Sequence, residues 1–526
     1  MRIKITRLKK SIEKYESVVL YGAGNAARLT IKALKEEGIA PAFCIVSEKG
    51  AAKKVDGICV FSLNECVSEL QKDHIIIIIA VTKLYQKEIE DNLVQKAIWN
   101  YIFLADYMGD ESSVYRNMTQ EEYLKEVAEW YVDRNHLPLD EISSVVQHMQ
   151  GALKRECDSN KILLIVGNLS PRVIKIAGAL QKKGYTVEVL CYLKGWINKV
   201  FLKKLEENSD IYLFCNTLEE MMYQLIYSGA RIAHVFSNMS ISNVVRVLID
   251  GKELFPKIAL DQYDIANEMY PFVSQEILDE ERYCLENVEG LVCRGFELEY
   301  LVNQMGYKIS AQMIEFFDYC DDLEIDSEIK KNEDELSLCY AGGLVAENEW
   351  KDASYFRLLE YADVCEKNKC HLHVYPSTWT EQGYAKYIAL DKESPYFHFH
   401  KPVPYENLME ELSRYDYGIG LLFCRALAGK KIDGYYTKEK LIYAACNHFY
   451  DYVSVGLPII SAVPIKLSQY FKKQGVLLDW ALEDYDFKEL KNRRNELRKN
   501  VSVVREKLRI DNQISKLINF YDLLTN

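Results

Sequence analysis

The chain has no long apolar segment, and its cysteines form no pattern typical of a binding site. Its longest apolar run, residues 75–81, is far too short to cross a bilayer and is typical of a buried strand. No apolar stretch near Met1 resembles a secretion signal. The 14 cysteines include no C-x-x-C pair and no zinc-ligand spacing. These absences predict a cytoplasmic protein with reduced thiols and at most peripheral membrane contact.

The chain also has too little positive charge for a general nucleic-acid binder. It carries 65 lysine and arginine residues against 78 aspartate and glutamate residues, a formal net charge of −13. This balance argues against binding nucleic acid through a broadly basic surface. A length of 526 residues with 49% hydrophobic residues is enough for three or four domains, each with its own core.

The first predicted domain, residues 1–106, has the pattern of a nucleotide-binding βαβ unit. A strand over 18–21 leads into a glycine turn at Gly22 and Gly24, and a helix follows. Ala27 stands at the third glycine position of the fingerprint, and Glu48 follows at about the distance of a ribose-binding carboxylate. The domain resembles small Rossmann-like units at the N-termini of bacterial sugar-modifying proteins. The alternative is a structural turn that binds nothing. This domain is also a possible site for a protein partner.

The remaining chain is predicted to form a helical connector and two further α/β lobes. Residues 107–160 are polar with helical periodicity. In residues 161–325, strands alternate with helices, which predicts a parallel, doubly wound sheet. The acidic stretch 321–335 is a plausible hinge before a second lobe, 326–486, and residues 487–526 read as C-terminal helices.

The most informative segment is 447–461, which reads N-H-F-Y-D-Y-V-S-V-G-L-P-I-I-S. It predicts a short helix that stops at Gly456 and a buried strand that begins after Pro458. Together with segments 336–343, 371–375, 397–404 and 415–421, it resembles retaining GT-B glycosyltransferases of the family 4 type, in the family's order. The resemblance implies that Asp451 binds the ribose hydroxyls of a sugar nucleotide.

The resemblance implies a hexosyltransferase-like glycosyltransferase of bacterial polysaccharide or glycoprotein biosynthesis. Its donor substrate would be a nucleoside-diphosphate sugar, and its acceptor a glycan, a lipid-linked glycan or a protein. The resemblance implies no tightly bound cofactor. It also implies no catalytic metal: Asp484 and Asp486 have the D-x-D spacing of a metal-binding motif, but they lie in a charged segment beyond the nucleotide motif. Retention of configuration is implied by the resemblance alone. The predicted donor-binding residues are Gly342, Gly343, Lys438, Asn447, His448 and Asp451.

Two departures from the family pattern leave an alternative open. Gly343 stands where many relatives have arginine, and Tyr443 stands where the first glutamate of a common pair is expected. Lys438, Lys440 or His448 would then have to supply the charge for the diphosphate. The alternative for Lys438 and Lys440 is that they are solvated lysines on a helix face. The alternative for His448 is that it only caps or packs. The alternative function is an inactive GT-B protein that binds a nucleotide or acts as the scaffold of another transferase.

In the acceptor lobe, Asp261 and Asp264 follow a predicted strand and are expected at the carboxyl edge of its sheet. A carboxylate there could orient or deprotonate an acceptor hydroxyl, so both are predicted catalytic residues. The alternative is that they cap the next helix. His234 is a further residue that could reach this edge.

Two pairs of histidines occupy alternate positions on predicted strands. His371 and His373 share one strand face, and His398 and His400 share another. A zinc site requires three or four converging ligands, which two such pairs supply only if their strands are neighbours. The sequence interpretation is that these are ordinary core or rim histidines and that no metal site exists.

Overall fold

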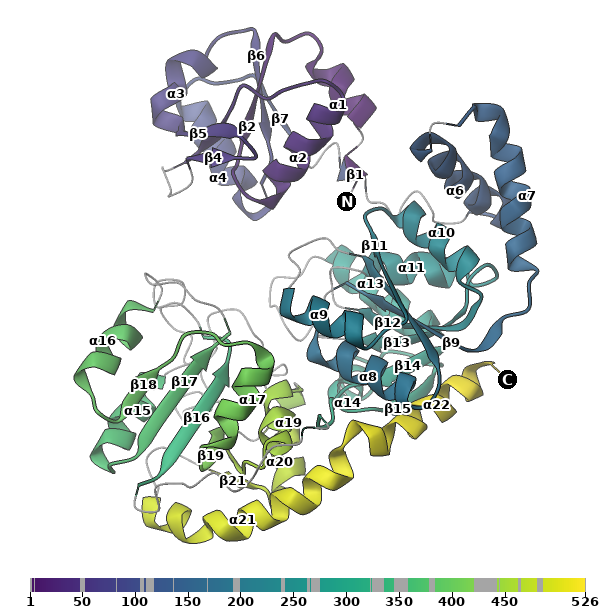
Figure 1. The fold of residues 1–526 in the computed structure, drawn as a ribbon. Coiled ribbons are helices and arrows are strands. Elements are labelled where there is room, and N and C mark those ends of the chain that lie inside the picture. The colour runs from purple at the N-terminus through teal and green to yellow at the C-terminus, as the bar shows by residue number, and fades with distance from the viewer. Residues whose placement is uncertain are drawn as a thin grey trace. The chain divides into compact units, whose positions relative to one another are not determined.

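The computed structural model divides the chain into two compact units, Met1–Thr119 and Gln120–Asn526 (Figure 1). The structure describes all residues except 1, 4, 48–52, 82, 105–107, 110–117, 136, 168, 193–198, 238–241, 263–264, 266–274, 322, 324–334, 345–357, 378–383, 421–441, 444, 462–464, 480–485 and 526. The predicted site residues Lys438 and Asp264, and the neighbouring candidates Glu48 and Lys440, lie outside the described residues.

The first unit is a parallel sheet with the strand order β4-β5-β3-β2-β6-β7, in which only β4 runs antiparallel to its neighbour. Strand β6, which lies between β2 and the edge strand β7, consists of five consecutive isoleucines, all buried, as expected for a strand covered on both faces. The strands of this sheet are β2 (Ser17–Tyr21), β3 (Phe43–Val46), β4 (Lys54–Val55), β5 (Ile58–Ser62), β6 (Ile75–Ile79) and β7 (Tyr101–Phe103). Two further strands of the unit, β1 (Arg2–Ile3) and β8 (Met108–Gly109), pair with each other as a separate antiparallel sheet. Its helices are α1 (Ile5–Ile12), α2 (Asn25–Glu36), α3 (Leu63–Leu70) and α4 (Lys83–Gln95).

The second unit begins with helices and continues as a seven-stranded parallel sheet. The helices of the predicted connector, α6 (Gln120–Arg134) and α7 (Ile142–Leu153), pack on each other and on α10. The sheet order is β11-β10-β9-β12-β13-β14-β15, so the chain starts in the middle and winds both ways. The strands are β9 (Asp158–Val166), β10 (Thr186–Tyr192), β11 (Ile211–Cys215), β12 (Ala230–Ser237), β13 (Lys257–Gln262), β14 (Gly290–Cys293) and β15 (Gln312–Glu315). The helices are α8 (Pro171–Lys182), α9 (Lys199–Glu207), α10 (Leu218–Ser228), α11 (Ser242–Asp250), α13 (Gln275–Asn287) and α14 (Glu297–Asn303).

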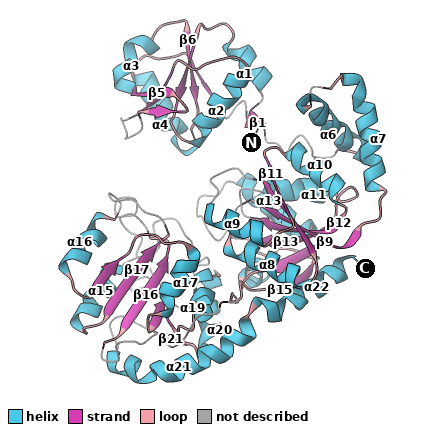
Figure 2. Cartoon of the chain, in the orientation of Figure 1, coloured by secondary structure: helices cyan, strands magenta, loops and turns pink. Residues whose placement is uncertain are grey.

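A second parallel sheet follows within the same unit, with the strand order β18-β17-β16-β19-β20-β21 (Figure 2). We call the sheet β9–β15 with its helices lobe 1, and this sheet with its helices lobe 2. The strands of lobe 2 are β16 (Ser337–Gly342), β17 (His371–Pro376), β18 (Phe397–Phe399), β19 (Tyr417–Ile419), β20 (Ile459–Ser461) and β21 (Leu477–Asp479). Its helices are α15 (Leu358–Lys367), α16 (Ala385–Glu393), α17 (Tyr405–Ser413), α19 (Asn447–Ser454) and α20 (Lys466–Lys473). Two Rossmann-like lobes after a smaller α/β domain confirm the predicted α/β fold class with its GT-B arrangement.

Two long helices, α21 (Phe487–Leu508) and α22 (Ile510–Thr525), connect the lobes. On α21, Arg494 pairs with the buried Asp416 at 3.2 Å, and the carbonyl of Leu490 accepts a hydrogen bond from Tyr417 of β19. The next helix, α22, packs on α8 and on strands of lobe 1. The two consecutive helices therefore pack on different lobes (Figure 1). Among the described residues, no helix has the length and apolar character needed to span a bilayer.

The packing of α22 on lobe 1 predicts unequal effects of two leucine substitutions on the same helix. Leu517 is fully buried, whereas Leu523 is 67% exposed. We expect Leu517→Ala to lower the free energy of unfolding by about 2–4 kcal/mol, because it removes buried methyl groups and leaves a cavity. Leu523→Ala, the control, should change it by less than about 0.5 kcal/mol. Urea unfolding of the full chain measures both, and equal effects would contradict the docking of α22.

Candidate functional site

The candidate donor site is built around the helix α19, which forms as the sequence predicts. The helix ends at Ser454, and Gly456 takes a φ of 81°, a conformation that favours glycine. The amide of Leu457 then donates to the carbonyl of Tyr452, and β20 starts directly after Pro458. The helix begins at Asn447, on the carboxyl side of the sheet, because it precedes a parallel strand and runs back along the sheet. The predicted helix–glycine–proline–strand motif is confirmed.

Asn447 and His448 lie in the first turn of α19, and Asp451 follows them by four and three residues, so its side chain is a neighbour of both along the helix. The side-chain oxygen of Asn447 accepts a hydrogen bond from Arg294, which follows strand β14 of lobe 1. Arg294 also donates from Nε to both carboxylate oxygens of Asp318, at 3.0 Å each. One guanidinium group therefore connects the first turn of α19 to the segment that leaves lobe 1.

Asp451 is a half-buried carboxylate, and its charge is poorly compensated. Its Oδ1 accepts a hydrogen bond of 2.9 Å from the hydroxyl of Tyr405, the first residue of α17. Burial raises the pKa of Asp451 to about 6, against the opposing effects of Lys175 and the Tyr405 hydrogen bond, and Asp321 raises it further. Additional hydroxyl donors would stabilise the negative charge of such a half-buried carboxylate.

His448 provides a hydrogen-bonding group without a charge. Its Nε2 atom is buried and has no hydrogen-bond partner among the described residues. The rings of Tyr340 and Tyr452 lie edge-on to it, with centroids at 6.1 and 5.6 Å. Burial lowers the pKa of His448 to about 4, so the imidazole is neutral at pH 7. It can therefore donate an N–H to a phosphate oxygen, but it does not supply the positive charge considered from the sequence.

The glycine turn after β16 leaves open backbone. An ideal Cβ on Gly343 would meet only Ser377 Oγ, at 4.0 Å, whereas one on Gly342 would lie 3.0 Å from the hydroxyl of Tyr340. That hydroxyl donates to the carbonyl of Gly343 at 2.8 Å, which fixes the turn. Tyr340 also borders His448, so the turn and the first turn of α19 lie near the same aromatic ring. Donor binding by the two glycines stays a prediction.

A cavity of about 150 Å³ lies beside Tyr405, in the second unit. Its walls include Lys175, Lys182 and Lys204, together with Asp321 and Tyr405. Three of these residues also influence the pKa of Asp451, so the carboxylate and the cavity share an electrostatic environment. The cavity is smaller than the usual small-molecule site of about 300–1,000 Å³, and we do not assign the whole donor to it.

Asp261, the predicted acceptor-side catalyst, is the last buried residue of β13 and is fully enclosed. Its Oδ2 accepts from Arg172 Nε at 2.8 Å and lies 3.3 Å from His234 Nε2. His234 Nδ1 lies 2.6 Å from the hydroxyl of Tyr521 on α22. Because a carboxylate only accepts, His234 donates from Nε2 and accepts from Tyr521. Burial lowers the pKa of His234, consistent with this neutral form.

This arrangement makes Asp261 a partner of Arg172 rather than the helix cap considered from the sequence. In the described structure no acceptor hydroxyl can reach its carboxylate, although its Oδ1 has no hydrogen-bond partner among the described residues. Its predicted role as a catalyst stays a prediction. His234 likewise points into this buried network and not toward a cleft.

In the first unit, the two predicted glycines have different surroundings. Gly22 has a φ of 127°, and an ideal Cβ would lie 2.7 Å from the carbonyl oxygen of Ala80, so glycine is required there by the fold itself. Gly24 is exposed and precedes α2, and an ideal Cβ would meet no atom within 4 Å. Only Gly24 therefore leaves space for a ligand at the start of the helix. Nucleotide binding by this unit stays a prediction.

Three residues of the site were missed by sequence reasoning: Tyr405, Lys175 and Arg294. Two of them carried a usable signal, because Tyr405 directly follows the V-P turn at 403–404 and Arg294 directly follows the buried strand β14. Residues that follow parallel strands gather at the carboxyl edge of a sheet. Lys175 lies in the middle of α8, where no local pattern indicates its position beside Asp451.

No protein-family model and no curated protein matches the sequence. Several solved structures resemble the chain at low sequence identity. They include Anabaena HepE in complex with UDP (11% identity, 68% of this chain and 99% of that chain covered, TM-score 0.47) and TarM (8%, 70% and 98%, TM-score 0.46). A Thermobaculum terrenum O-GlcNAc transferase mutant is also similar (10% identity, 77% of this chain and 79% of that chain covered, TM-score 0.43). Similarity at this level says nothing about the activity of this chain.

The raised pKa of Asp451 predicts that its charge destabilises the fold. The unfolded carboxyl titrates near 3.8 and the folded one near 6, so stability is lost as the pH rises through this window. Asp451→Asn should therefore raise the free energy of unfolding at pH 7.5 on the order of 1–2 kcal/mol. Most of the gain should be lost near pH 3.5, where the Asp451 carboxyl is neutral in the folded protein and mostly neutral in the unfolded chain. Urea unfolding at both pH values measures this.

The matched control is Asp363→Asn on α15, where the side chain is exposed. It should change stability by less than about 0.5 kcal/mol at either pH. A loss of stability for Asp451→Asn at pH 7.5 would show that the charge is compensated in the folded protein, and the description above would be wrong.

Proposed function

We propose that the chain is a glycosyltransferase that moves a sugar from a nucleoside-diphosphate donor to a glycan, a lipid-linked glycan or a protein acceptor. The observation that carries this proposal is the state of Asp451. A half-buried carboxylate with a raised pKa at the carboxyl edge of a parallel sheet has capacity for hydroxyl donors. The ribose of a sugar nucleotide supplies two such hydroxyls.

The diphosphate is proposed to lie between the turn at Gly342 and Gly343 and the first turn of α19. The open backbone at Gly343 allows close approach, and the N-terminus of α19 carries partial positive charge. His448 contributes a neutral N–H from its unpartnered Nε2. Lys438 is proposed to supply the formal positive charge. These groups stabilise the charge that develops on the leaving diphosphate.

In this proposal the transfer needs no metal ion, because backbone and side-chain donors stabilise the leaving group. Retention of configuration remains part of the proposal and rests on the sequence resemblance. On the acceptor side, Asp264 and Asp261 remain the proposed carboxylates, and Asp261 would act only if its pairing with Arg172 opens. In the closed pairing, Asp261 positions the strand end from which Asp264 follows.

The proposal predicts that Asp451→Ala weakens donor binding. We expect a loss of about 1.5–3 kcal/mol in the binding free energy of the matching nucleoside diphosphate, the scale of hydrogen bonds to a charged group. Calorimetric titration with a panel that includes UDP, GDP, ADP and dTDP measures it. Asp363→Ala is the control and should bind as the unaltered chain does. Equal affinity of a folded Asp451→Ala variant would refute the ribose assignment.

The same panel, presented as sugar nucleotides with a small acceptor, tests the activity itself. Release of the diphosphate in the presence of acceptor is the expected result. Binding without turnover for every donor and acceptor would favour a nucleotide-binding protein that is not an enzyme, and binding of no nucleotide would refute both.

The separation of the chain into two units predicts that the first unit is dispensable for transfer. All proposed donor and acceptor groups lie in Gln120–Asn526, which is compact by itself. A chain that starts at Thr119 should therefore fold and retain kcat with saturating donor and a small acceptor. Its thermal melt and its donor affinity are the controls. If the shortened chain folds and binds donor but transfers no sugar, then the first unit completes the active site and is not dispensable.

A further inference from the structure

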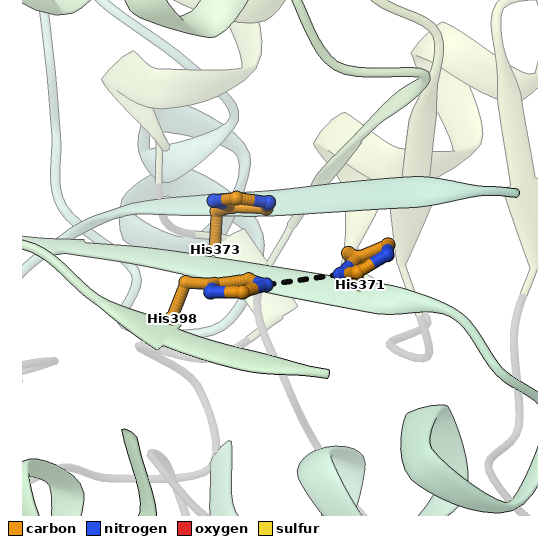
Figure 3. A group of neighbouring side chains, drawn as sticks. All are labelled: His371, His373 and His398. Atoms are coloured by element: carbon orange, nitrogen blue, oxygen red, sulfur yellow. Dashed lines mark hydrogen bonds between the residues drawn. The ribbon is translucent and has the colours of Figure 1, made fainter. Parts of the chain in front are cut away.

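Four histidines gather on one face of lobe 2, on the neighbouring strands β17 and β18. His371 and His373 alternate along β17, and His398 and His400 alternate along β18 and its end. The strands pair in parallel with His373 opposite His398. Since alternate residues of a strand point to the same side of the sheet, the register brings all four rings to one face. Figure 3 shows three of them together.

Nitrogen atoms of three of these rings lie close together. One ligand atom each from His371, His373 and His398 lies within 4.8 Å of the other two. His371 Nδ1 and His398 Nε2 are 2.9 Å apart (Figure 3). Zinc with nitrogen ligands at about 2.0–2.1 Å in tetrahedral geometry places those nitrogens about 3.3 Å apart. An ion would require side-chain rotations that bring the three nitrogens to this spacing, while His373 Nδ1 now lies 3.0 Å from His400 Nε2.

A carboxylate outside the cluster orients one ligand. His371 Nε2 lies 3.1 Å from Glu335 Oε2. Because the carboxylate accepts, the ring proton of His371 is on Nε2, and its bare Nδ1 points at His398. The partner His398 then donates from Nε2 in the metal-free state. A cation between the two atoms takes the place of this proton, which moves to the other nitrogen of His398. This carboxylate–histidine arrangement is typical of metal ligands.

The rings of His373 and His398 stack with centroids 4.3 Å apart. Imidazole lone pairs lie in the plane of the ring, so one of these two rings has to turn before both nitrogens face the same ion.

We propose that His371, His373 and His398 form a site for one divalent transition-metal cation, with zinc the best match, and that the bound ion fastens the edge strand β18 to β17. Imidazole ligands suit zinc, copper and nickel, whereas magnesium and calcium prefer oxygen ligands. Among the described strands, the edge strand β18 pairs only with β17, so a second attachment stabilises it. The ion takes no part in the proposed sugar transfer.

The test uses the untagged full chain, freed of metal by a chelator that is then removed. Titration with Zn²⁺ at pH 7.5 by calorimetry should give one ion per chain and a higher melting temperature, and Mg²⁺ should give neither. His373→Gln and His398→Gln should each weaken Zn²⁺ binding at least tenfold. His148→Gln, at an exposed histidine of α7, is the control and should bind as the unaltered chain does.

Two further measurements separate ligation from a role in packing. Co²⁺ should give the intense visible absorption of a tetrahedral nitrogen site, and this absorption should be lost in His373→Gln. Glu335→Gln should weaken Zn²⁺ binding about tenfold without changing the melt of the metal-free protein. The absence of stoichiometric Zn²⁺ binding, or unchanged affinity in folded His373→Gln and His398→Gln variants, would overturn the proposal. A melting temperature that depends on pH but not on Zn²⁺ would do the same, because the cluster would then respond only to protons.

Discussion

The buried guanidinium of Arg172 is the interaction on which the second unit depends. It is 1% exposed, binds Asp261 at the end of β13, and donates to the carbonyl oxygens of Phe316 and Phe317, where the chain leaves lobe 1. Burial alone would raise the pKa of the next residue, Asp318, but Arg294 and Arg172 hold it below its ordinary value. A buried ion of this kind is tolerated only when its partners are all in place. The path of the interlobe segment is therefore coupled to the core of lobe 1.

The network also reaches the proposed donor site. Arg294 contacts both Asp318 and Asn447, so the first turn of α19 is held by a residue of lobe 1. Behind it, Lys175 donates to the carbonyl of Tyr319 at 2.7 Å and partly offsets the charge of Asp451. Any rearrangement of the interlobe segment would change the hydrogen bonding of Asn447 and the charge around Asp451 together. Donor binding and the arrangement of the lobes thus share the same few charged groups.

The sequence predicted the fold well because its signals are local. Alternating strands and helices, the glycine that ends α19 and the proline that follows it are all consequences of backbone geometry within a few residues. The partners of the site residues were not predictable in this way. The pairing of Arg172 with Asp261 and the position of Lys175 beside Asp451 join residues that are far apart in the chain. The histidine pairs were recognised, but only the pairing register of β17 and β18 shows that they meet, and the sequence interpretation left them as ordinary histidines.

The helix α22 gives the protein an unusual order of assembly. Tyr521 is fully buried in lobe 1, where its hydroxyl reaches His234, and the two residues are separated by 287 positions. All of lobe 2 is synthesised between them. While the ribosome makes lobe 2, the core of lobe 1 lacks the helix that covers His234 and Gly290, and apolar surface there stays exposed to solvent or to chaperones. Lobe 1 is therefore made before lobe 2, but its core is complete only after lobe 2 and α22 have been synthesised.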